Sequence, residues 1–118
     1  MTAPRFLTID VSAAEPVAGA PAQDRVVSGS PTFRTWNVEE AEGGLYAGIW
    51  EATPGAWRIS YDEWEFCHIL AGVSVITEDH GEARRVKTGD SFVLRPGFKG
   101  IWEVLETTRK EYVIRLAP

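Results

Sequence analysis

The sequence predicts a single all-β domain of the barrel or sandwich type, and two observations lead to this prediction. From residue 32 onwards, short runs rich in β-branched and aromatic residues alternate with turn signals. No segment shows a sustained hydrophobic period of 3.6 residues, the pattern of a helix with one buried face. Many short strands at such spacing are typical of β-sandwiches and β-barrels.

The expected strands follow one another with short turns between them. Residues 38–42 fit one short helical turn, and the Gly-Gly pair at 43–44 reverses the chain after it. Later turns are indicated by Pro-Gly at 54–55 and 96–97, by Gly72, by His-Gly at 80–81 and by Gly-Asp at 89–90. We expect strands at residues 32–37, 45–52, 57–61, 65–71, 73–78, 84–87, 91–94, 100–106 and 110–116.

Residues 1–31 are predicted to form an extended N-terminal arm that precedes a barrel domain at residues 32–118. Residues 11–23 are rich in Ala, Pro and Gly, and residues 28–31 are a Ser-Gly-Ser-Pro turn cluster. Such a composition predicts little regular structure. Phe6, Leu7 and Ile9 are apolar, so they are available to dock on a neighbouring surface.

The composition limits the kinds of partner, and the cellular compartment, that we expect for this protein. With 118 residues the chain fits one domain, and 17 acidic against 12 basic side chains give a net charge of -5. A nucleic-acid partner is not expected, because it normally requires a basic patch. No apolar run approaches the ~20 residues of a membrane span. The single cysteine, Cys67, rules out an intrachain disulfide and suits a reducing compartment, so we expect a cytoplasmic protein.

The two faces of the strand at 65–71 are both largely apolar. Because successive strand residues point to opposite faces, Glu65 shares a face with Cys67 and Ile69. The other face carries Phe66, His68 and Leu70. A strand of this kind is covered on both sides, by the barrel interior on one and by a second sheet, the arm or another subunit on the other. We therefore expect a homodimer, the commonest closed assembly.

Two segments resemble the motifs of the cupin family. Residues 65–72 (EFCHILAG) are similar to the end of the first cupin motif, in which a Glu precedes a Gly by seven positions. Residues 89–97 (GDSFVLRPG) resemble the second motif. With residues 97–104 and 109–112, the chain is similar to a small subgroup that includes the ureidoglycine aminohydrolase cupin domain and the ethanolamine-utilisation cupin. The resemblance implies an RmlC-like jelly-roll β-barrel.

The chain departs from this family at the metal-binding positions. Three histidines of the standard cupin site are replaced by Ile59, Tyr61 and Gly100, and of the four ligands only Glu65 remains. Transition metals held by imidazoles would have too few ligands here, so we expect no metal and no other cofactor. Arg95 also replaces a residue that is usually Pro in the second motif.

Glu65 is the candidate catalytic residue. By resemblance its carboxylate points into the barrel, where it could act as a general base or bind an amine or hydroxyl of a substrate. The alternative is a structural carboxylate neutralised by a core partner such as Arg58 or Lys110.

The other site candidates are ligand-binding residues. Tyr61 either hydrogen-bonds a ligand or fills the space of the lost metal. Trp102 lies two residues after Gly100, so it points to the same face of the strand and is expected inside the barrel. Glu63 either shares the face of Glu65 or is a solvated turn residue. Lys110 is either an anion binder or a surface lysine. His68, on the opposite face from Glu65, is expected to be a packed or interface residue.

These residues lead to two functional hypotheses. The first is a metal-independent cupin that binds a small polar metabolite in its barrel, with a possible enzymatic activity on a C–N bond of a ureide-like or amine compound. The second is a non-catalytic, dimeric binding or scaffold module with a filled barrel. Whether the barrel is open on the Glu65 side decides between them.

Overall fold

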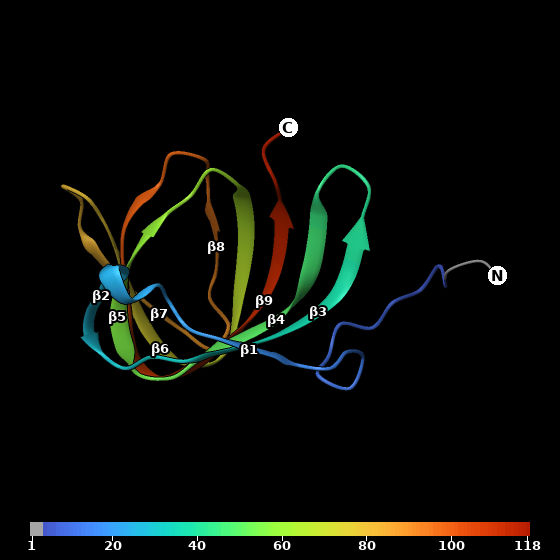
Figure 1. Cartoon of the computed structure of the whole chain (residues 1–118), viewed down its shortest axis with the longest axis horizontal. Helices are drawn as coiled ribbons and strands as arrows, with labels where there is room; N and C mark the ends of the chain where they lie inside the picture. Colours follow the sequence, from blue (N-terminus) through green and yellow to red (C-terminus); the bar gives the residue numbers. More distant parts are fainter. Residues whose placement is uncertain (1–3) are drawn as a thin grey trace.

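All nine strands belong to one antiparallel sheet that curls into a barrel, in a computed structural model that describes residues 4–118 (Figure 1). The strands run in the order β1-β3-β4-β9-β5-β2, and β6 joins them by pairing with β7, β8 and β9. Their bounds are β1 Val17–Gly19, β2 Val26–Gly29, β3 Phe33–Ala41, β4 Leu45–Ala52, β5 Gly55–Ser60, β6 Trp64–Glu78, β7 Ala83–Lys87, β8 Ser91–Leu94 and β9 Lys99–Arg115, with a single 3-10 turn, η1, at Gln23–Arg25. The predicted all-β class is confirmed.

Two long, bent strands, β6 and β9, hold the two halves of the sheet together. The C-terminal part of β9 pairs with β4 and its N-terminal part pairs with β5, while β6 accompanies it on the other side. The predicted break at Gly72 is therefore wrong, because β6 continues through it with bulges between Ile69 and Ser74. Gly72 has a φ of 87°, and a Cβ there would lie 2.1 Å from the carbonyl oxygen of Thr107. A bend at this close crossing of β6 and β9 requires glycine.

Two other differences from the predicted strands concern β3 and the N-terminal residues. Residues 38–41 continue β3 and do not form a helical turn; a register shift between Asn37 and Glu39 absorbs the irregularity. Within residues 1–31, β1 pairs with β3 and β2 pairs with β5, so each adds a short strand to the sheet. Main-chain hydrogen bonds to an exposed edge need little from the side chains, which is why the composition does not signal them. Residues 4–16 run away from the barrel (Figure 1), and Phe6 is 86% exposed.

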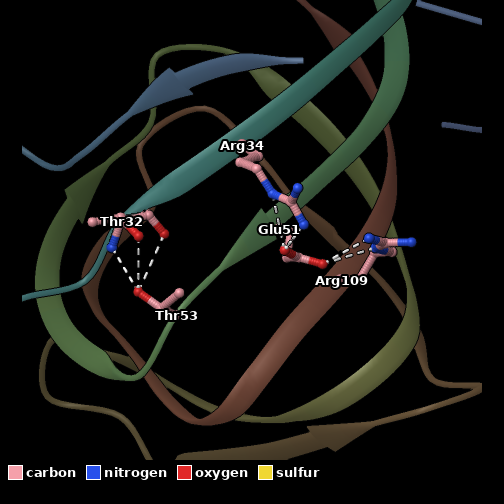
Figure 2. A network of polar contacts seen from close by, with 5 residues as sticks. All are labelled: Thr32, Arg34, Glu51, Thr53 and Arg109. Atoms are coloured by element: carbon pink, nitrogen blue, oxygen red, sulfur yellow. Dashed lines mark hydrogen bonds and ion pairs between the residues drawn. The ribbon is translucent and has the colours of Figure 1, made fainter. Parts of the chain in front are cut away.

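A polar network on the outer face shows which way neighbouring side chains of β9 point. Figure 2 shows Glu51 of β4 between Arg34 of β3 and Arg109 of β9, with ion-pair distances of 2.7 and 2.8 Å. Thr53 joins the ends of β3 and β4 by accepting the backbone N–H of Thr32 at 2.8 Å. Because Arg109 points outward here, the next residue of the strand points into the barrel.

The interior is built from aromatic and branched side chains. Its buried cluster consists of Ala52, Trp57, Ile69, Ile76, Val86, Leu94, Trp102 and Val104. Trp102 is 1% exposed, and its indole N–H donates to the hydroxyl of Ser74, which is hydrogen-bonded in turn to Thr108 at 2.7 Å. These partners satisfy polar groups that burial would otherwise penalise. In the described residues we find no helix with the length and apolarity needed to cross a membrane.

A candidate ligand-binding cavity

A cavity of about 380 Å³ lies inside the barrel, and it brings all five predicted site residues together. It is lined by Phe33, Thr35, Asn37, Tyr46, Trp50, Trp57, Ile59, Tyr61, Glu63, Glu65, Trp102, Lys110, Tyr112 and Ile114. Ring surfaces and a few polar groups in a space of this size are typical of small-molecule sites. The barrel is therefore not completely filled by its own side chains.

Glu65 and Lys110 form a buried ion pair at the wall of this cavity. The Lys110 Nζ lies 2.9 Å from Glu65 Oε2, and the two residues are 4% and 2% exposed. The Tyr61 hydroxyl donates to the other carboxylate oxygen, Oε1, at 2.5 Å. Both oxygens of Glu65 thus have a donor, as a buried carboxylate requires. Of the two partners considered from the sequence, Lys110 is the one found, since Arg58 pairs with Asp79 on the surface.

The ammonium of Lys110 is also held by aromatic rings. Its Nζ lies 4.4 Å from the ring centroid of Trp50 and 4.6 Å from that of Trp102, both within the range of cation–π attraction. Desolvation by burial lowers the pKa of Lys110, but its interactions with Cys67 and Glu65 outweigh this effect and raise the pKa above its ordinary value of 10.5. Lys110 is accordingly a charged residue of the interior and not a surface lysine.

Two neighbours of this pair stay protonated at neutral pH. Burial, with the nearby charge of Glu65, raises the pKa of the Tyr61 phenol well above its ordinary value, so Tyr61 is a donor. Burial raises the pKa of the Cys67 thiol to about 12. The negative charge that faces Lys110 at neutral pH is therefore that of Glu65, and Cys67 is a buried thiol and not a nucleophile.

Glu63 carries the uncompensated charge of the cavity. It lies in the turn between β5 and β6, is partly buried and accepts the backbone N–H of Asp62 at 3.0 Å. No cation lies within ion-pair distance of it among the described residues. Since Glu65 and Lys110 cancel, the lining has a net charge of -1. A second polar group is formed by Tyr112, whose hydroxyl donates to Asn37 Oδ1 at 2.7 Å.

The residues at the three lost histidine positions do not fit a metal site. Ile59 and Gly100 are paired across β5 and β9, and Tyr61 is committed to Glu65. A Cβ at Gly100 would lie 2.1 Å from the carbonyl oxygen of Thr77, so this position has no room for any side chain. Across residues 4–118, no three His, Cys, Asp or Glu side chains are grouped closely enough to hold a metal ion. The ammonium of Lys110 lies beside Glu65, which is the only one of the four metal-ligand positions of the family where this chain keeps the ligand residue.

The histidines lie elsewhere. His68 is partly buried on the outer face of β6, and its Nδ1 is 2.7 Å from the Ser91 hydroxyl of β8. This contact agrees with the packed alternative of the prediction, and the interface alternative stays a prediction. His80 is exposed in the turn after β6, with a φ of 63°.

Sequence reasoning missed several polar or aromatic residues of the site, among them Trp50, Asn37 and Tyr112. Tyr112 lies two residues after Lys110 on β9, so both side chains point to the same face of the strand. This local pattern is enough to predict that Tyr112 lines the site. Trp50 faces Lys110 only because β4 pairs with β9 in that register. No local pattern indicates this pairing.

Comparisons with known proteins identify solved structures of similar fold. A solved protein of unknown function of the DUF861 family from Pseudomonas syringae pv. tomato is 24% identical over 90% of this chain and 46% of its own, with a TM-score of 0.80. The EutQ protein of Clostridium difficile is 20% identical over 75% of this chain and 65% of its own, with a TM-score of 0.66. A DUF861 protein from Thermotoga maritima is 34% identical over 54% of this chain and 73% of its own, with a TM-score of 0.53.

The first two of these proteins are distant in sequence, so they show the shared fold alone. This chain spans less than two thirds of their length. No curated protein matches the chain significantly. The model of the EutQ-like cupin domain, however, matches residues 39–112, which is more than half of the chain and includes Glu65 and Lys110. The chain therefore belongs to the EutQ-like cupin family.

Proposed function

We propose that this protein is a metal-independent cupin that binds a small polar metabolite bearing an amine, guanidine or ureide nitrogen. The observation that carries the proposal is the open cavity, with aromatic walls and one uncompensated carboxylate, Glu63. Trp57 provides aromatic surface that attracts a cation, and Glu63 supplies its counter-charge. Asn37 and Thr35 offer further hydrogen bonds to an N–H group.

Binding is a better-supported role than catalysis. An enzyme acting on a C–N bond would use Glu65 as its base, but both oxygens of Glu65 already accept a donor from Tyr61 or Lys110. A base role requires one of these donors to be displaced first. The alternative, a scaffold module with a filled barrel, is disfavoured by a cavity of about 380 Å³.

We expect Glu63→Gln to weaken the binding of a cationic ligand by at least about tenfold, because a charge-assisted hydrogen bond contributes about 1.5–3 kcal/mol. Small amines and guanidines are titrated against neutral ureides and anionic analogues of similar size, and the indole signals of Trp50 and Trp57 are followed by NMR. Glu103→Gln, at an exposed position on the outer face of β9, is the matched control. Equal responses to cationic and anionic analogues would contradict the proposal.

Elemental analysis is expected to find no stoichiometric Mn, Fe, Ni or Zn in protein purified without chelators. The reason is the donor set: only Glu65 remains of the four family ligands, and its carboxylate is paired with Lys110. One equivalent of any of these metals that is lost in Glu65→Gln would overturn the metal-independent part of the proposal.

We also propose that the protein is a homodimer. Trp64 and Val93 are 36% and 41% exposed on the outer face of β6 and β8, beside Phe66, and Phe6 of the arm is free to cross to a second copy. Apolar surface of this kind is usually covered. Light scattering at micromolar concentration is expected to give twice the monomer mass of 13.1 kDa, whereas a 13.1 kDa species would refute the dimer.

A further inference from the structure

A second cavity, of about 640 Å³, lies among β6, β7, β8 and the loop that follows β8. Its lining consists of Ile76, Glu78, Arg84, Val86, Phe92, Val93, Leu94, Arg95, Pro96, Gly97 and Phe98. Ile76, Val86 and Leu94 are buried and belong to the core cluster, and Phe92 and Phe98 pack against it. One part of the wall is therefore apolar and partly aromatic and another part is charged, in a space large enough for a small organic molecule.

The charge in this cavity has the opposite sign from the charge in the first one. Arg84 is paired across the sheet with Ile76, whose side chain is buried, so Arg84 extends from the inner face of β7. Arg95 lines the cavity from the loop after β8. No ion pair of either arginine is found among residues 4–118, and Glu78 is the single carboxylate of the lining. Two guanidiniums against one carboxylate leave a net charge of +1, in a chain whose overall charge is -5.

The two cavities are separate sites divided by aromatic contacts. The ring of Phe92, in the second cavity, lies 6.1 Å from Trp102, which lines the first. The ring of Phe98 lies 6.4 Å from Tyr61 in an edge-to-face contact. Ligands of opposite charge can therefore be held on the two sides of this aromatic partition.

We propose that the second cavity binds a small organic monoanion, a carboxylate attached to an apolar or aromatic body. Guanidinium groups bind carboxylates through paired, charge-assisted hydrogen bonds, which gives Arg84 and Arg95 of the lining a role in holding the ligand. The body packs on Phe92, Phe98 and the buried branched side chains. Glu78 disfavours ligands with an additional negative charge and sets the preference for a single carboxylate.

Benzoate is the probe that tests this site, with benzamide and benzylammonium as neutral and cationic analogues of similar size. Binding is followed by NMR titration of the full chain. Benzoate is expected to bind at least tenfold more tightly than either analogue and to shift the amide signals of residues 92–98. Arg84→Gln and Arg95→Gln are each expected to weaken benzoate binding about tenfold. Arg85→Gln is the matched control, because Arg85 is exposed on the opposite face of β7 and does not line the cavity.

Three results would overturn the proposal. The first is benzamide binding as tightly as benzoate, because the arginines would then contribute nothing. The second is a response confined to the Trp50 and Trp57 indoles, which would place the anion in the first cavity. The third is an unchanged affinity for benzoate in both Arg84→Gln and Arg95→Gln, which would show that the guanidiniums of the lining do not hold the carboxylate.

Discussion

Replacing Lys110 with Met is expected to destabilise the protein by about 3–5 kcal/mol, because it leaves the buried carboxylate of Glu65 without its counter-charge. The Lys110 Nζ lies 2.9 Å from Glu65 Oε2, and both residues are almost fully buried. Met keeps most of the aliphatic stem, so lost packing contributes little. Urea unfolding, followed by tryptophan fluorescence, measures the change in the free energy of unfolding.

Two further variants separate the effect of the unpaired buried charge on stability from the effect of changing a lysine side chain. Glu65→Gln combined with Lys110→Met removes both charges and is expected to recover a large part of the loss. Lys87→Met is the control for an exposed pair, because Lys87 lies 3.9 Å from Asp90 at the surface; its effect is expected to stay within about 1 kcal/mol. A loss below about 1 kcal/mol for Lys110→Met alone would refute the buried ion pair.

The same ion pair predicts the direction of the alkaline pH dependence. The pKa of Lys110 is raised above 10.5 in the folded protein, so its stabilising contribution is fully present below that value. The contribution is lost as the pH rises through the raised pKa. Lys110→Met lacks this titration, so the difference in stability between wild type and variant is expected to shrink in strongly alkaline solution.

Gly100→Ala is expected to destabilise the protein by about 3 kcal/mol, a large effect for the addition of one methyl group. The new Cβ would lie 2.1 Å from the carbonyl oxygen of Thr77 and 2.9 Å from the Cα of Glu78. Both atoms belong to the backbone of β6, which is paired with β9 at this position and cannot move without breaking the ladder. Urea unfolding of the variant measures the loss.

Gly19→Ala is the matched control for this substitution. Gly19 also lies in a strand, β1, but its nearest neighbour to a new Cβ is the Cβ of Phe33 at 4.0 Å, an ordinary contact. A change within about 0.5 kcal/mol is expected there. If Gly100→Ala were equally mild, the steric argument against a third metal ligand at this position would fail with it.

The sequence by itself determined the features that depend on local periodicity and on single positions. The all-β class follows from short strands between turn formers, and the two-residue alternation of a strand places Glu65 on the buried side with Cys67. Ile59, Tyr61 and Gly100 can be identified as departures from the cupin ligand positions without a structure. Each of these inferences needs only neighbouring residues or a motif, because the side-chain direction in a strand is set by the backbone itself.

Only the tertiary structure decided the partners of these residues. Whether Arg58 or Lys110 neutralises Glu65 depends on the register between β6 and β9, in which Lys110 pairs with Ile69 on the inward face. Trp50 reaches Lys110 through the separate register of β4 with β9. Such registers join segments far apart in the sequence, and they are set by the packing of the whole interior and by the bulges near Gly72. A local pattern predicts which way a side chain points, but it does not carry the information about what that side chain meets.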